Sequence, residues 1–243
     1  MTSNPMTQSK IYEGAVLDGE PMTINGAVNK TIMLLLVTFA VGVFTWVQAF
    51  AGYMDKVIML MLGGVIAGLI LAIIMRFKPQ NAKILSLAYA VCEGLAIGGL
   101  SAMYEMQLKG IVANAALITF ITLFMMLILY KAGIIKATDT FKKVIFTATA
   151  AIMVFYLVSI VVSFFSPNFI AVWNTGWLGI VLSLVFCAVA ALNFILDFDF
   201  IEQGAQNMAP KYFEWFGAFS LLVTIIWLYL ELLRLLAQLS RNR

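Results

Sequence analysis

Continuous apolar runs dominate the chain, and polar residues are concentrated in the stretches between them. Each run has about twenty residues, the length that a helix needs to cross a hydrocarbon core of about 30 Å. Strands of a membrane β-barrel would instead alternate apolar and polar residues over about ten positions. The pattern therefore predicts seven transmembrane helices, near Thr31–Gly52, Val57–Met75, Ile84–Met103, Ile111–Tyr130, Val144–Phe165, Trp173–Phe200 and Phe213–Leu236.

Residues 1–26 precede the first run and are mostly polar, without the apolar core of a signal peptide. We therefore expect two parts: a mobile polar cytoplasmic N-terminal tail over 1–26 and a seven-helix transmembrane domain over 27–243. All five prolines fall outside the predicted spans. Uninterrupted helices are therefore expected, which weakens the case for a transporter built on proline-broken helices.

Composition agrees with an all-α integral membrane protein. Apolar residues make up 63% of the chain and charged residues only 11%, which is too few to cover a soluble surface. The absence of histidine excludes a histidine-based zinc site and a serine–histidine–aspartate triad. Cys92 and Cys187 both lie inside apolar runs, which favours packing roles over redox chemistry. We expect no enzyme activity, no cofactor and, without a basic cluster, no nucleic-acid partner.

The distribution of Lys and Arg predicts the orientation, because these residues accumulate on the cytoplasmic side of membrane proteins. With the N-terminus inside, the inner segments hold ten of the 15 basic residues and the outer segments hold five. The N-terminus is therefore expected in the cytoplasm and the C-terminus outside.

Ionisable residues within the spans are candidates for function, because a charge at the bilayer centre costs several kcal/mol. Glu93 lies about 14 Å into the third span by helix rise, close to the middle of the membrane. Two interpretations stay open for it. It is either a hydrogen-bonded packing residue or a proton or cation site on an internal cavity.

A second acidic group, Asp197, Asp199 and Glu202, closes the sixth span. An interfacial cap explains Glu202 but not Asp197, which lies between two apolar residues. Acidic residues at a helix C-terminus also oppose the helix dipole, so a cation should compensate them. Arg76, at the end of the second span, is the expected partner, and the pair would form a carboxylate–arginine latch.

Glu231 belongs to a polar stripe of the seventh span. Ser220, Thr224, Trp227 and Glu231 share one helix face, which indicates that this helix faces the interior of the bundle. Pairing between Glu231 and Asp199 is not expected, because they lie roughly 20 Å apart along the membrane normal. An i, i+3 ion pair with Arg234 is the favoured role.

Glycine pairs with GxxxG spacing occur in the second and third spans, at Gly64/Gly68 and Gly94/Gly98. Such pairs let two helices approach closely, and a packing role is the preferred interpretation.

Three of these stretches together resemble the Bax inhibitor-1 family (transmembrane Bax inhibitor motif proteins). The third span, with Pro79-Gln80-Asn81, Cys92-Glu93-Gly94-Leu95 and Gly98, is similar to the family's third helix, which carries an EG element after a short basic loop. The stretch from Leu196 to Glu202 resembles its acidic helix end, and that from Trp227 to Arg234 its final helix. The resemblance covers about 27–237 and is closest to the bacterial branch.

The resemblance implies six helices around a central seventh, in the plasma membrane of a bacterium. It also implies a pH-sensitive calcium leak channel, gated by two aspartates on the sixth and seventh helices with an arginine latch from the second. Asp199 or Asp197 matches the sixth-helix aspartate and Arg76 the latch. Thr224 stands where the family has the seventh-helix aspartate, so another acid must replace it.

The leading hypothesis is therefore a cation leak gated by protonation of Asp197 or Asp199, with Glu93, Thr224 and Glu231 lining the pathway. No high-affinity metal site is expected, only transient calcium contact at Asp197, Asp199 and Glu202. Two alternatives stay open. One is a non-conducting regulator that binds another membrane protein such as a protease, and the other is a proton-coupled transporter that uses Glu93.

Overall fold

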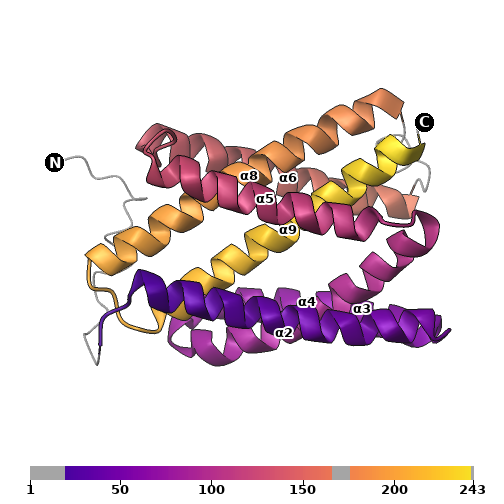
Figure 1. The fold of residues 1–243 in the computed structure, drawn as a ribbon, viewed down its shortest axis with the longest axis horizontal. Helices are drawn as coiled ribbons and strands as arrows, with labels where there is room; N and C mark the ends of the chain where they lie inside the picture. Colours follow the sequence, from indigo (N-terminus) through magenta and orange to yellow (C-terminus); the bar gives the residue numbers. More distant parts are fainter. Residues whose placement is uncertain (1–19, 166–175, 242–243) are drawn as a thin grey trace. The chain divides into compact units, whose positions relative to one another are not determined.

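Seven long α-helices and one short 3₁₀ helix make up the described part of the chain (Figure 1). The structure is a computed structural model and describes residues 20–165 and 176–241. In chain order the elements are α2 (Ile24–Phe50), α3 (Met54–Phe77), η1 (Pro79–Asn81), α4 (Ala82–Gln107), α5 (Ile111–Lys131), α6 (Asp139–Phe165), α8 (Gly176–Gln206) and α9 (Phe213–Arg241). These two ranges contain no β-strand, and each of the seven α-helices is long and apolar enough to cross a membrane. The predicted all-α membrane fold with seven spans is confirmed.

The first helix begins earlier than the pattern predicted. α2 starts at Ile24 instead of near Thr31. Thr23 is the N-cap residue, and its hydroxyl accepts a hydrogen bond from the Gly26 amide. This short side-chain cap explains why a helix can start within a polar sequence. The rest of the predicted tail, 1–19, lies outside the described residues.

Other helices also extend beyond the predicted spans, and α9, for example, continues to Arg241 instead of ending near Leu236. α6 begins at Asp139 instead of near Val144, and α8 continues to Gln206 instead of ending near Phe200. A hydropathy pattern marks only the part of a helix inside the hydrocarbon core, so polar helix ends are missed. The predicted start of the sixth span at Trp173 lies outside the described residues.

The chain divides into two compact units, and α8 and α9 contribute to both. The first unit contains the chain up to Met103 together with Asp199–Leu222. The second contains Tyr104–Phe198 and Val223–Arg243.

Glycines bring the helices of the first unit into close contact. A side-chain carbon added at Gly94 would lie 2.7 Å from the Thr38 carbonyl oxygen, and one at Gly98 would overlap the backbone of Gly42. These contacts align α4 with α2. A carbon added at Gly64 would lie 2.5 Å from the Cys92 carbonyl oxygen, so α3 approaches α4 equally closely. The packing interpretation of both GxxxG pairs is confirmed.

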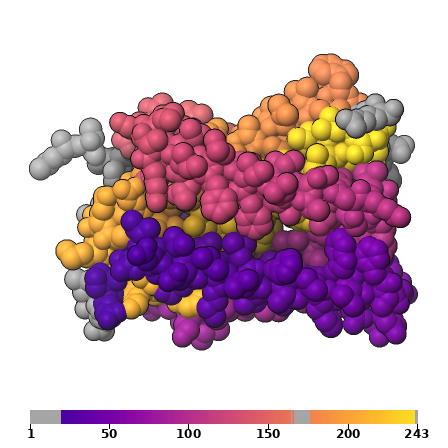
Figure 2. All heavy atoms as spheres, viewed as in Figure 1, coloured from indigo at the N-terminus to yellow at the C-terminus, as the bar shows by residue number. Residues whose placement is uncertain are grey.

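α9 is the most buried of the seven spans. Inside its most apolar stretch 61% of residues are buried, against 44% for the span that contains α4 and less for the others. The other helices expose large apolar side chains, as a bilayer-facing surface requires. α2, for example, lies at the surface along its length in Figure 2, and its Leu36 and Phe39 are exposed.

Candidate functional site

Asp197 and Thr224 meet in the second unit. The Thr224 hydroxyl donates a hydrogen bond of 2.6 Å to Asp197 Oδ2, and each residue is only 7% exposed. A carboxylate at this depth of burial needs hydrogen-bond donors, because its desolvation costs several kcal/mol. Of the two aspartates that matched the family's sixth-helix position, Asp197 is therefore the one that contacts Thr224.

The Asp197–Thr224 contact fixes how α8 and α9 run beside each other. Ser183 precedes Asp197 by fourteen residues on α8, and Gln238 follows Thr224 by fourteen residues on α9. These two also pair, since the Ser183 hydroxyl donates a 3.0 Å hydrogen bond to Gln238 Oε1. Fourteen residues are close to four turns of helix, so both polar contacts lie on one face of the antiparallel pair.

Glu231 lies midway between these two contacts along α9 and is 2% exposed. In the same register the α8 residue opposite it is Ala190, which has no polar side chain. Glu231 instead accepts hydrogen bonds from the Tyr156 hydroxyl of α6 and, at 3.1 Å, from Trp227 Nε1. Its second oxygen forms an ion pair with Arg234 at 3.3 Å, which confirms the predicted i, i+3 pair.

Arg234 joins Glu231 and Tyr156 into one cluster. Its Nη1 donates a 2.5 Å hydrogen bond to the Tyr156 oxygen, and the guanidinium lies 5.0 Å from the centre of the Tyr156 ring. A buried carboxylate with a cation and two neutral donors is a fully compensated arrangement. The cluster therefore holds α6 and α9 together.

Asp199 and Glu202 belong to the first unit. Asp199 is 9% exposed, and its Oδ2 accepts a 2.9 Å hydrogen bond from Gln203 Nε2. Glu202 is half-buried and accepts a 3.3 Å hydrogen bond from Gln206. Both acids therefore use amide side chains one helical turn further along α8.

Arg76 and Asp199 lie in the same unit, but they do not form an ion pair. Arg76 is in the last turn of α3 and is exposed. Its guanidinium makes no hydrogen bond or ion pair with the described residues of that unit. The latch therefore stays a prediction about another conformation of the protein.

Glu93 is half-buried on α4 and faces α3. Its Oε1 would lie 3.6 Å from a side-chain carbon added at Gly68, and Tyr89 lies one helical turn before it on α4. The carboxylate therefore occupies space that the glycine leaves open between α3 and α4. Both interpretations of Glu93 remain compatible with this position.

Within residues 20–165 and 176–241, acidic and cysteine side chains do not gather in groups of three that could hold a metal ion. Asp197, Asp199 and Glu202 are thus no metal cluster, and transient calcium contact at them stays a prediction.

Several polar residues that take part in these contacts were not predicted from the sequence. Tyr156 and Ser183 could have been noticed as polar positions inside apolar spans, whereas Gln238 follows the predicted end of the seventh span at Leu236. Asn193 could also have been noticed, and its Nδ2 donates a 2.9 Å hydrogen bond to the Thr149 hydroxyl. The buried Glu214, 1% exposed, could have been noticed as an acid in the first turn of the seventh span.

Comparison with known families gives one assignment. The family model described as Bax inhibitor 1 like matches residues 3–241, nearly the whole chain. Neither the curated proteins nor the solved structures include a significant match to the chain.

Proposed function

The chain belongs to the Bax inhibitor 1 like family, and from this premise we propose that it is a pH-sensitive cation leak channel that carries calcium. Protonation of buried carboxylates gates the leak, and Asp197 is the principal sensor. The observation that supports this choice is the hydrogen bond between Asp197 and Thr224, because it links the α8 acid directly to the most buried helix. The protein is not an enzyme.

The proposed gate uses the charge of the carboxylates. Ionised Asp197 accepts the hydrogen bond from Thr224, which holds α8 against α9 and favours the closed state. Protonation removes the charge and weakens this bond, so the population shifts toward the open state. Arg76 acts as an additional latch by pairing with Asp199 when the channel is fully closed, and this pair is not formed in the structure described above.

The proposed ion pathway contains the other intramembrane polar groups. Glu93, Thr224 and Glu231 line it, and calcium makes transient contact with Asp197, Asp199 and Glu202 on its way through. These are oxygen ligands, which calcium prefers, and their separation suits passage better than tight binding.

The proposed location is the plasma membrane of a bacterium, with the N-terminus in the cytoplasm and the C-terminus outside. The excess of Lys and Arg in the segments assigned to the inner side supports this orientation.

The test is calcium flux into liposomes that contain the purified protein, at pH 6, 7 and 8. We expect a leak that is larger at pH 6 than at pH 8 in the unmodified protein. Asp197→Asn, which cannot ionise, should leak at pH 8 as the unmodified protein does at pH 6. Asp199→Asn and Arg76→Gln report on the latch and should raise the leak at pH 8 while keeping part of the pH response.

Glu20→Gln is the control, because it removes an exposed carboxylate that precedes α2 and has no part in the proposed pathway. It should leave the leak and its pH response unchanged. Flux no greater than that of empty liposomes at every pH would overturn the proposal and favour the non-conducting regulator. A leak that follows the pH gradient instead of the pH would favour the proton-coupled transporter.

A further inference from the structure

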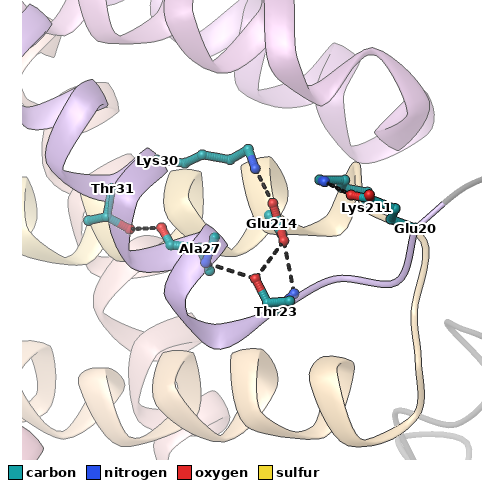
Figure 3. A network of polar contacts seen from close by, with 8 residues as sticks. Glu20, Thr23, Ala27, Lys30, Thr31, Lys211 and Glu214 are labelled. Carbon is teal, nitrogen blue, oxygen red and sulfur yellow. Dashed lines mark hydrogen bonds and ion pairs between the residues drawn. The ribbon is translucent and has the colours of Figure 1, made fainter.

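Glu214 is almost completely buried at the start of α9, and its donors come from the start of α2 (Figure 3). The Thr23 amide donates a 2.8 Å hydrogen bond to Glu214 Oε1, and the Thr23 hydroxyl donates one of 3.0 Å to the same oxygen. Lys30 forms an ion pair with the other oxygen. A single carboxylate on α9 therefore binds three donors of another helix.

The start of α2 contains only half of a standard capping arrangement. In a capping box, the N-cap hydroxyl accepts a hydrogen bond from the amide three residues later. The side chain of a Glu or Gln at that later position in turn accepts a hydrogen bond from the N-cap amide. Here the Gly26 amide donates to the Thr23 hydroxyl at 2.9 Å, which is the first half. Gly26 has no side chain to supply the second half.

Glu214 occupies the place of the missing side chain. A side-chain carbon added at Gly26 would overlap the carboxylate of Glu214, so the glycine leaves the space that Glu214 fills. The bond from the Thr23 amide to Glu214 Oε1 is the one that a Glu at position 26 would otherwise accept. We propose that Glu214 completes the capping box of α2 from α9, and that this inter-helix box is a conformational clasp between the two helices.

Electrostatics favours a carboxylate at this position. It lies at the N-terminus of α2 and in the first turn of α9, and both helix N-termini carry partial positive charge. Lys30 adds a full positive charge, and its ammonium also lies 5.3 Å from the centre of the Trp215 ring. The Thr23 donors, Lys30 and the two helix N-termini thus compensate the buried charge.

The segment before α2 strengthens the same attachment. Pro21 forms an isolated β-bridge with Pro210, and the Met22 amide donates a 2.7 Å hydrogen bond to the Ala209 carbonyl. Met22 is 2% exposed, so it is held in the fold. The segment that leads into α2 is therefore hydrogen-bonded to the turn between α8 and α9.

The clasp controls the leak, and this part of the inference rests on the proposed function. α9 also carries Thr224, ten residues after Glu214 and about 15 Å along the same helix. When α2 and α9 are clasped, the start of α9 is fixed. Release of the clasp lets α9 move, which disfavours the closed position of Thr224.

Hydrogen exchange of individual amides tests the clasp without any assumption about transport. The Gly26 and Thr23 amides report on the cap, and the Met22 amide reports on the attachment to the α8–α9 turn. In Glu214→Ala we expect all three amides to exchange about five- to thirtyfold faster than in the unmodified protein. Glu20→Gln, which removes an exposed carboxylate next to the clasp, should leave the Gly26 and Thr23 amides unchanged.

The decisive variant moves the carboxylate from α9 to α2. Gly26→Glu combined with Glu214→Ala converts the clasp into an ordinary capping box within α2. The introduced carboxylate also stands four residues before Lys30, the favourable spacing for a helical ion pair. We expect the Thr23 and Gly26 amides to regain slow exchange, because the cap is restored. The Met22 amide should remain fast, because α2 is no longer attached to α9.

The two readouts separate the clasp from the leak. We expect Glu214→Ala and the double variant to raise calcium flux at pH 8 to the same extent, by about fivefold. Restoration of normal flux by the double variant would show that capping alone matters and would overturn the clasp. Unchanged exchange in Glu214→Ala would also overturn it, and this holds even if the unmodified protein carries no calcium. If Glu214→Ala does not fold, Gly26→Ala serves instead, because its added carbon displaces the carboxylate.

Discussion

The buried carboxylates of Asp197, Glu214 and Glu231 are compensated by different kinds of donor. Asp197 uses a threonine hydroxyl, Glu214 uses an N-cap residue and a lysine, and Glu231 uses a tyrosine, a tryptophan and an arginine. A neutral donor compensates a carboxylate less completely than a cation does. Asp197 accepts a hydrogen bond from Thr224, a neutral donor on α9, which suits the proposed sensor.

The contribution of the hydrogen bond between Thr224 and Asp197 can be measured by removing the hydroxyl. Thr224→Val keeps the shape of the side chain but removes the donor from Asp197. We expect the free energy of unfolding in detergent to fall by about 1–3 kcal/mol. The corresponding decrease in Tm is about 2–4 °C per kcal/mol for a chain of this size. Thr224→Ser keeps the donor, so its free energy of unfolding should fall much less. A larger loss in Thr224→Ser than in Thr224→Val would show that the methyl group, not the hydrogen bond, stabilises the contact.

Glu20 gives a prediction about pH outside the membrane-spanning helices. Its hydrogen bond and ion pair with Lys211 lower the pKa of the carboxyl below the ordinary 4.5. Because the folded pKa is lowered, the contribution of this pair is present above pH 4.5 and is lost as the pH falls through the lowered pKa. Carbon NMR of Glu20 in detergent should therefore show a titration midpoint below 4.5. Lys211→Met should move the midpoint back toward 4.5, and a midpoint that does not move would contradict the pair.

At the scale of helices, packing in the first unit depends on backbone contact across glycines. Gly98→Ala places a carbon against the backbone of Gly42, which cannot move aside as a flexible side chain could. We expect the free energy of unfolding to fall by about 1–3 kcal/mol, as for other overpacked sites. Thermal unfolding in detergent gives the measurement.

Gly63 provides the matched control, because it lies in α3 with nothing within 4 Å of an added carbon. Gly63→Ala should leave the Tm unchanged or raise it slightly, since alanine has the higher helix propensity. A loss in Gly63→Ala as large as that in Gly98→Ala would mean that glycine is needed for helix flexibility and not for close packing.

The number and type of helices could be predicted from the sequence because each span is apolar over its whole length. Local spacing was also sufficient where both partners lie on one helix, as for Glu231 and Arg234. The start of α2 was missed for the opposite reason. Its capping box contains Glu214, 191 residues away from Thr23, and no local pattern could indicate that partner.

The site was predictable only in part, because contacts between helices depend on their register. The sequence left Asp197 and Asp199 as equal candidates for the family's sixth-helix aspartate. Side chains two positions apart on a helix point in directions about 200° apart. Only the packed structure therefore decides whether Asp197 or Asp199 contacts Thr224. Tyr156 was missed as a partner of Glu231 for the same reason, since it comes from α6.

At the scale of the whole molecule, buried polar side chains and exposed apolar side chains are concentrated on different helices. Buried polar side chains are frequent on α9, which carries Glu214, Thr224, Glu231 and Gln238. Helices such as α3 and α6 have mostly apolar side chains toward the outside. In a bilayer, a polar side chain costs the least free energy when it faces away from lipid, and such positions can line an ion pathway. This separation is what a leak along α9 requires.

The orientation of the molecule is the remaining property that a direct experiment can decide. If all seven described helices cross the membrane, the start of α2 and the end of α9 lie on opposite sides, so one loop on each side is enough. Lys78 between α3 and η1 and Lys109 between α4 and α5 are both exposed. The charge distribution predicts Lys78 inside and Lys109 outside.

Single cysteines at these two positions, in a background with Cys92→Ala and Cys187→Ala, can be labelled with a membrane-impermeant maleimide. In intact cells Lys109→Cys should react, and Lys78→Cys should react only after the membrane is opened. The reverse pattern would place the α8 end that carries Asp199 and Glu202 on the outer face. The carboxylates would then respond to external pH, and the proposed cytoplasmic latch through Arg76 would have to be abandoned.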